Sequence, residues 1–213
     1  MITVFGRATS SNVQAVMWTI GELDLAYERH DLGHRFGGLD TPEFLAMNPN
    51  GLVPVIRDGD DAPLWESGAI VRYLAARHGG DDFWPRDHVR RAQVDKWAEW
   101  AKVTVTRLFT GPIFWHVVRT PVAERDHVRL ARDLAELAVK LAIADRRLQE
   151  SSFLAGDTLT VADIMFGHLL YRYFDIGIER PPLSALDAYY RRLCDRPAYA
   201  EHVMISYDEL RIE

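Results

Sequence analysis

Along the first part of the chain, the hydrophobic residues follow two different spacings. A short β-branched and aromatic run at residues 2–5 ends at Gly6 and predicts a strand, and residues 27–32 predict a second one. Between them, Val13, Val16 and Ile20 recur every three or four positions, which predicts an amphipathic helix over residues 12–22. The chain therefore begins with the order strand, helix, strand.

Turn-forming residues divide the next stretch into short elements. Thr41 before Pro42 predicts the start of a short helix, because threonine caps helices and proline is tolerated in the first helical turn. This helix ends by residues 48–51. Residues 53–57 and 63–65 flank a turn rich in Asp and Gly, which predicts a hairpin, and a third helix follows over residues 67–78.

The second part of the chain shows helical spacing. From about residue 88 onward, apolar residues repeat at intervals of three and four, first in Val94, Trp97, Ala98 and Ala101, and again in Leu130, Leu134, Leu137 and Leu141. Thr160 and Asp163 have the spacing of a capping box. We therefore expect an α/β domain over residues 1–80 and an all-α helical bundle over residues 88–213.

Composition limits the class of protein. The chain has 213 residues, a formal net charge of -6 and no long basic block, which argues against binding to nucleic acid or to an anionic membrane. Its lone cysteine, Cys194, excludes an intrachain disulfide and a C-x-x-C redox pair. The sequence shows no secretory signal, no apolar stretch of the ~20 residues that span a bilayer and no cluster of metal ligands. We expect a cytoplasmic protein that binds no metal.

A bend and a helix start predict a small binding pocket. Pro54 cannot donate to a sheet ladder, so it marks a strand start, an edge or a bend, and the Val53–Pro54 bond is a candidate for the cis isomer. Glu66 and Ser67 begin the third predicted helix, whose first backbone N–H groups carry a partial positive charge. Together these features suit a peptide-like anion.

The same features occur in order along the chains of a known family. The bend Asn48-Pro49-Asn50-Gly51-Leu52-Val53-Pro54, the Glu66-Ser67 pair and the cap Thr160-Val161-Ala162-Asp163 resemble those of cytosolic glutathione S-transferases. The loop at residues 7–12 contains serines and no tyrosine, and it resembles the bacterial, serine-type, theta- and zeta-like branches. The resemblance covers nearly the whole chain. It implies a thioredoxin-like N-terminal domain that binds glutathione and an all-α domain that carries the second-substrate site.

The resemblance also implies an activity. In this family the thiolate of glutathione, a co-substrate, attacks an electrophilic and largely apolar compound, often in detoxification, and the protein is usually a homodimer. Two other hypotheses keep the fold but change the function. One is a non-catalytic binding or regulatory protein, and the other is a glutathione-dependent peroxidase, isomerase or dehalogenase.

The resemblance implies a hydrogen-bond donor for the thiol, because only the thiolate is a good nucleophile. Register along the first predicted helix matches Ser10 to the catalytic serine of the family. Ser11 and the amide of Asn12 are alternatives. Serine is also a preferred N-cap, so one of Ser10 and Ser11 is expected to cap the helix, and Ser11 is free for this role when Ser10 is the donor.

The remaining contacts to glutathione follow from the same resemblance. Ser67 and its backbone N–H are expected to hold the γ-glutamyl carboxylate, and Glu66 is expected to bind the α-amino group. The backbone of Val53, before Pro54, is expected to pair with the cysteinyl main chain, as an edge strand pairs with an added peptide.

At the glycyl end of glutathione, this chain departs from the family. Many members have a lysine directly after the glycine of the bend, where this chain has Leu52. Arg35, His34 or Asn50 is expected to contact the glycyl carboxylate instead. For the apolar second substrate, we expect contacts from Phe109, Trp115 and His116 in the helical domain.

Overall fold

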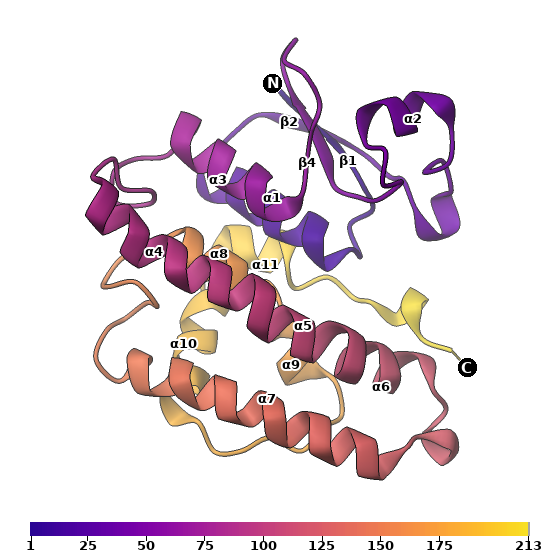
Figure 1. Cartoon of the computed structure of the whole chain (residues 1–213), viewed down its shortest axis with the longest axis vertical. Helices are drawn as coiled ribbons and strands as arrows, with labels where there is room; N and C mark the ends of the chain where they lie inside the picture. Colours follow the sequence, from indigo (N-terminus) through magenta and orange to yellow (C-terminus); the bar gives the residue numbers. More distant parts are fainter. Residues whose placement is uncertain (213) are drawn as a thin grey trace.

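A four-stranded mixed sheet with helices packed on it forms the first part of the chain, and helices form the rest (Figure 1). The computed structural model describes residues 1–212. The first elements are β1 (Ile2–Phe5), α1 (Ser11–Glu22), β2 (Tyr27–His30), α2 (Pro42–Met47), β3 (Val55–Asp58), β4 (Leu64–Trp65) and α3 (Ser67–His78). Their order is the one that the sequence predicts, and the thioredoxin-like fold class of this part is confirmed.

The sheet has the strand order β2-β1-β3-β4. Strand β1 pairs in parallel with β2 and antiparallel with β3, and β3 and β4 form the predicted hairpin. The second strand ends at His30, earlier than the sequence suggests, although the Leu32 carbonyl still accepts a hydrogen bond from the Arg7 backbone N–H at 3.1 Å. Thr41 caps α2 through its side chain, as predicted.

Helix α1 is buried on all sides, which differs from the predicted amphipathic helix. Every residue from Val13 to Ile20 is buried, including Gln14 and Thr19. The helix lies between the sheet and the helical part of the chain, where α11 covers its outer side (Figure 1). Gln14 Nε2 donates to the Ala8 carbonyl at 3.1 Å, and Thr19 Oγ1 donates to the Ala15 carbonyl at 2.9 Å. Both polar side chains therefore place a donor on a backbone carbonyl within the core.

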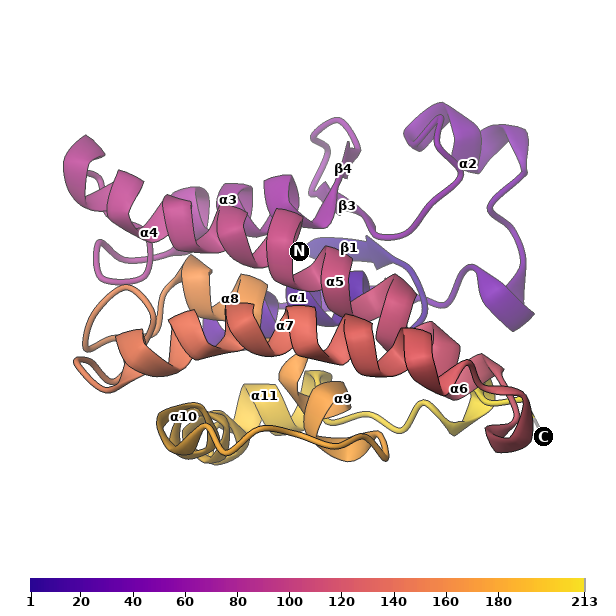
Figure 2. The same ribbon diagram turned by 60° about the horizontal axis from the view of Figure 1, so that its bottom comes forward.

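The helical part begins with one long, nearly continuous helical column beside α7 (Figures 1 and 2). The column consists of α4 (His88–Trp100), the π-helical turn η2 (Ala101–Val105), α5 (Thr106–Phe109), the π-helical turn η3 (Thr110–Trp115) and α6 (His116–Arg119). It is followed by α7 (His127–Leu148), α8 (Val161–Gly167), α9 (Leu170–Asp175), α10 (Ser184–Cys194), α11 (Pro197–His202) and the 3-10 turn η5 (Asp208–Leu210). None of these described helices is long and apolar enough to cross a membrane.

The capping box at the start of α8 forms as the sequence predicts. The Thr160 hydroxyl accepts from the Ala162 backbone, and the Asp163 carboxylate accepts from the Thr160 backbone N–H at 2.8 Å. Asp163 is fully buried and also accepts from the Leu154 backbone at 2.9 Å and the Tyr189 hydroxyl at 2.9 Å. The cap therefore fixes α8 to its neighbours as well as to its own first turn.

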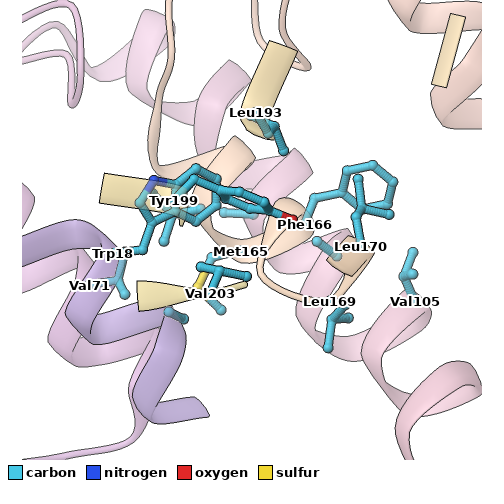
Figure 3. Packing of buried hydrophobic residues seen from close by; sticks show 14 of the residues in the cluster. Trp18, Val71, Val105, Met165, Phe166, Leu169, Leu170, Leu193, Tyr199 and Val203 are labelled. Carbon is cyan, nitrogen blue, oxygen red and sulfur yellow. The ribbon is translucent and has the colours of Figure 1, made fainter. Parts of the chain in front are cut away.

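A single hydrophobic core joins the two parts of the chain (Figure 3). Trp18 of α1 and Tyr199 of α11 meet edge to face, with ring centroids 4.8 Å apart. The Trp18 indole N–H donates to the Glu22 carboxylate at 2.8 Å. Arg196 donates to both oxygens of the same carboxylate. These contacts hold α1, which carries the predicted catalytic loop at its start, against the helical part.

Candidate functional site

The candidate site begins where β1 ends. Gly6 has φ of +152°, and a Cβ built on it would lie 2.6 Å from Val13 Cγ2 and 3.1 Å from Val53 Cβ. The first distance is too short for any side chain, and the second leaves very little room for one. Glycine at this position therefore lets the end of β1, the first turn of α1 and the bend at Val53 come together.

Ser10 is the N-cap residue of α1, and its side chain makes no capping hydrogen bond. It is 9% exposed, and within residues 1–212 its hydroxyl has no hydrogen-bond partner. Of the two serines, Ser10 takes the cap position, because Ser11 is the first helical residue. The cap position and a free hydroxyl thus fall on Ser10, the first choice for contact with a thiol.

The bend before β3 contains a cis bond between Val53 and Pro54, as the sequence suggests. Buried Asn48 shapes this bend: its amide donates to the Leu52 carbonyl at 2.7 Å, and its oxygen accepts from the Asn50 backbone at 3.1 Å. Within the described residues, the backbone N–H and C=O of Val53 have no partner. The edge predicted to pair with an extended peptide is therefore open.

Glu66 and Ser67 lie at the start of α3. Glu66 is exposed and has φ of +70°, a left-handed conformation that strains a residue with a side chain. Ser67 is 2% exposed, and its hydroxyl is turned inward. Strain of this kind is often found at binding sites, and here it gives the start of α3 an exposed carboxylate beside a buried hydroxyl.

Three polar side chains from three elements meet beneath this helix start. The Ser67 hydroxyl donates to Asn12 Oδ1 at 3.1 Å. Lys102 Nζ, from the π-helical turn η2, donates to the same Asn12 oxygen at 3.0 Å and to Ser67 Oγ at 2.8 Å. Asn12 is two positions after Ser10, so this cluster brings the starts of α1 and α3 to one place. In this cluster the side-chain amide oxygen of Asn12 already accepts hydrogen bonds from two donors.

The sequence reasoning missed Lys102. It lies four residues after buried Ala98 and one after buried Ala101, so it falls beside the apolar stripe of the column. A lysine beside an apolar stripe is the sequence signal that could have identified Lys102 as a candidate. Burial lowers the pKa of Lys102, and the charges of Glu66 and Glu99 act in the opposite direction.

A fully buried cation, Arg172, contacts the residue before Ser10. Arg172 of α9 is 2% exposed and donates to the Thr9 carbonyl at 2.7 Å. Its guanidinium lies over the Phe114 ring, 4.6 Å from the centroid. Burial and the nearby charge of Arg7 lower the pKa of Arg172 to about 10, so it stays positive at neutral pH. The sequence reasoning also missed this arginine, which interrupts an apolar and aromatic segment.

The candidates for the glycyl end lie apart from this cluster. Arg35 is exposed and forms an ion pair with Glu209 of the C-terminal turn η5 at 3.1 Å, while the Glu209 carboxylate also accepts from the Thr9 hydroxyl. His34 is exposed and makes no side-chain contact that fixes it among the described residues. Asn50 is exposed and donates to Asn48 at 2.9 Å. Arg35 is thus the candidate that carries a charge and is held near the loop of Ser10.

The predicted second-substrate residues have different environments. Phe109 is 2% exposed and packs against Phe114 and Tyr173, so its ring fills the core instead of lining an open surface. Trp115 is half-buried beneath the Arg119 guanidinium, 3.9 Å from its ring centroid. His116 is half-buried, and its Nε2 is enclosed without a partner among residues 1–212.

Comparisons with known proteins agree on one family. Models described as "Glutathione S-transferase, N-terminal domain" and "Glutathione S-transferase, C-terminal domain" match residues 4–82 and 103–197. Glutathione S-transferase GstB of Escherichia coli (strain K12) is 41% identical over 206 residues, which cover 96% of this chain and 99% of that protein.

Solved structures extend the likeness to three dimensions. The theta class glutathione S-transferase from the citrus canker pathogen Xanthomonas axonopodis pv. citri, with glutathione bound, is 44% identical with a TM-score of 0.90, covering 96% of this chain and 98% of that one. Glutathione transferase F2 from Populus trichocarpa is 25% identical with a TM-score of 0.83, covering 95% and 97%.

Proposed function

The chain belongs to the glutathione S-transferase family, and from this membership we propose how its residues activate glutathione for attack on an electrophile. The activity is that of a glutathione transferase. The observation that carries the proposal is the hydrogen bond of 3.1 Å between Asn12 and Ser67, which joins the loop of Ser10 to the start of α3. A tripeptide lying between those two helix starts has its sulfur at one end of the site and its amino-acid head at the other.

Ser10 donates a hydrogen bond to the thiolate. A free thiol of this kind titrates near ~8.5, so ionising it at neutral pH needs a downward shift of about two units, or roughly 2.7 kcal/mol. A hydrogen bond to a charged group contributes about 1.5–3 kcal/mol, which is sufficient in scale. The Ser10 hydroxyl is unpartnered within the described residues, so it gives up no other hydrogen bond to do this.

Asn12 supports the site in a different way from the predicted alternative. Its oxygen is held by Ser67 and Lys102, so the amide ties the two helix starts together. We assign the thiolate contact to Ser10, leave Ser11 as a second hydroxyl nearby, and assign Asn12 an organising role.

The backbone of glutathione lies along the open edge at Val53. Its cysteinyl N–H and C=O pair with the unpartnered backbone groups of Val53, next to the cis bond with Pro54. Glu66 binds the α-amino group, and Ser67 with its backbone N–H binds the γ-glutamyl carboxylate at the positive end of α3. The exposed Glu66 carboxylate and buried Ser67 hydroxyl suit the two charges of that zwitterionic head.

Arg35 takes the glycyl carboxylate, since Leu52 offers no charge at the position where many relatives have a lysine. It is a cation already held near the catalytic loop by Glu209. The electrophile contacts Trp115 and His116 on the helical side, and its apolar surface is buried there.

The larger arrangement is proposed on the same basis. Residues 1–80 form the glutathione-binding domain, and residues 88–213 form the domain that supplies the second-substrate site. We propose a cytoplasmic homodimer that acts in detoxification, as is common in the family. Light scattering on the purified protein tests the dimer: a mass near twice 24.3 kDa is expected, and a monomer contradicts it.

Titration of bound glutathione tests the role of Ser10. The ultraviolet absorbance of the thiolate is followed against pH in the wild type, in Ser10→Ala and in the neighbouring control Ser11→Ala. We expect the wild type to lower the thiol pKa by about two units and Ser10→Ala to lose about one to two of these units. Ser11→Ala is expected to change it by less. The reverse ranking transfers the role to Ser11, and glutathione bound with the pKa of free thiol supports a non-catalytic binding protein.

A further inference from the structure

Lys102 is a cation for which the described part of the chain provides no direct counter-ion. Its Nζ donates to the Asn12 oxygen at 3.0 Å and to the Ser67 hydroxyl at 2.8 Å, and both acceptors are neutral. No ion pair within residues 1–212 includes it. The nearby Glu99 pairs instead with Arg72 at 2.7 Å. The charges of Glu66 and Glu99 act on Lys102 from nearby, but neither carboxylate pairs with it directly. An anion in direct contact would offset the cost of half-burying this ammonium.

In the cluster of Asn12, Ser67 and Lys102, one N–H group of the lysine is left for a further acceptor. An ammonium group has three N–H bonds, and the two contacts of Lys102 use two of them. The Ser67 hydroxyl donates to Asn12 while its oxygen accepts from Lys102. An anion at Ser67 can therefore receive the third N–H of Lys102, the Ser67 hydroxyl after rotation, and the backbone N–H groups at the start of α3.

The lysine comes from the helical part of the chain, whereas Asn12 and Ser67 belong to the first part. It lies in the π-helical turn η2, and π-helical turns are frequent at functional sites. Its contact with Ser67 therefore places a charge from the second part of the chain inside the proposed glutathione site of the first.

We propose that Lys102 is a specificity-determining residue that binds the α-carboxylate of the γ-glutamyl group of glutathione, together with Ser67. This proposal rests on the proposed function and deepens it. Lys102 selects a thiol peptide whose N-terminal group carries a free α-carboxylate, because that carboxylate gives the ammonium the direct ion pair that the described residues do not supply. Glu66 selects the α-amino group of the same head.

Three ligands separate these contacts. Glutathione carries both the carboxylate and the amine, 4-aminobutanoyl-Cys-Gly lacks the carboxylate, and glutaryl-Cys-Gly lacks the amine. Their dissociation constants are measured by calorimetry for the wild type, Lys102→Met and the control Lys96→Met, which removes an exposed lysine on α4. We expect Lys102→Met to weaken glutathione and glutaryl-Cys-Gly roughly tenfold to hundredfold, and 4-aminobutanoyl-Cys-Gly less than about twofold. Lys96→Met changes none of them.

Other results have distinct meanings. Equal weakening of all three ligands by Lys102→Met assigns the lysine a structural role and overturns the proposal, as does no weakening at all. A wild type that binds no glutathione contradicts the proposed function itself. Thermal unfolding without ligand is a second readout: loss of the buried charge leaves the midpoint of Lys102→Met unchanged or higher, whereas a structural role lowers it.

Lys102→Arg keeps the test decisive if the methionine variant does not fold. Arginine retains the charge, so it is expected to retain the preference for the two ligands that carry a carboxylate. An arginine variant that binds glutathione and 4-aminobutanoyl-Cys-Gly equally well overturns the proposal.

Discussion

Arg172 is a charged side chain that is almost completely buried. Its single protein hydrogen bond goes to the Thr9 carbonyl, and its Nε is enclosed without a partner among residues 1–212. Phe114 and Tyr207 face its guanidinium. Burying a charge without a carboxylate costs free energy, so the residue is better explained by its effect on the neighbouring loop than by stability. That loop carries Ser10.

We predict that Arg172→Met raises the pKa of glutathione bound to the protein. A positive charge near a thiolate favours the ionised form, and methionine fills a similar volume without the charge. The expected rise is roughly one unit, measured by the same thiolate titration that tests Ser10. Arg146→Met, an exposed change on α7, is the control and leaves the pKa unaltered. If Arg172→Met lowers only the unfolding midpoint, the arginine acts through packing alone.

At the scale of elements, Asp58 joins the end of β3 to α3. Its carboxylate accepts from the Tyr73 hydroxyl at 3.0 Å, lies 2.9 Å from His78 Nε2 and pairs with Arg77 at 3.3 Å. Burial alone would raise the pKa of Asp58, but the hydrogen bonds from His78 and Tyr73 and the charge of Arg77 outweigh it. The pKa of Asp58 is therefore held below its ordinary 3.8.

This shift predicts a pH dependence of stability. A carboxyl whose pKa is lower in the folded state stabilises the fold fully above its unfolded value of 3.8, and the contribution is lost as the pH falls toward the folded value. Asp58→Asn should therefore lower the free energy of unfolding by about 1 kcal/mol near neutral pH, and by less below the ordinary carboxyl pKa. Urea unfolding of the wild type and of Asp58→Asn, at neutral pH and again below pH 3.8, measures this difference in the free energy of unfolding. The control is Asp60→Asn in the exposed turn that follows β3, and an Asp58 effect independent of pH contradicts the assignment.

The elements themselves could largely be predicted from the sequence, because their signals are local. The run at residues 2–5, the proline at Pro42 and the spacing of Thr160 and Asp163 each identified an element that the structure contains. The burial of α1 on all sides could not be predicted in this way. It depends on α11, which covers α1 from a distant part of the chain.

The site shows the same division. Ser10 and Asn12, like Glu66 and Ser67, lie close together in the sequence, so the resemblance to a family could single them out as candidates. Lys102 and Arg172 were missed, because each reaches the site only when the helical part packs against the first part. The distances of 35 positions between Ser67 and Lys102 and 163 between Thr9 and Arg172 explain why no local pattern reveals them.

At the scale of the molecule, the two parts of the chain share one core and should unfold together. The hydrophobic cluster runs from Ile2 in β1 to Leu210 in η5 without a break. Gly167, at the end of α8, lies at the junction (Figure 3 shows its neighbours Trp18 and Leu193). A Cβ built on Gly167 would lie 2.7 Å from Leu193 Cδ1 and 2.8 Å from Trp18 Cη2. Both neighbours are fully buried, so neither can move aside without disturbing the core.

We therefore predict that Gly167→Ala destabilises both parts of the chain at once. Overpacking of this kind costs about 1–3 kcal/mol, and each kcal/mol lowers the unfolding midpoint by about 2–4 °C in a protein of this size. Tryptophan fluorescence and far-ultraviolet circular dichroism should report the same single transition, shifted to lower temperature. Gly177→Ala is the matched control, because a Cβ there meets nothing within 4 Å. Two separate transitions, with only one shifted, contradict the shared core. They would mean that α1, with Trp18, can separate from the helical bundle while the bundle stays folded.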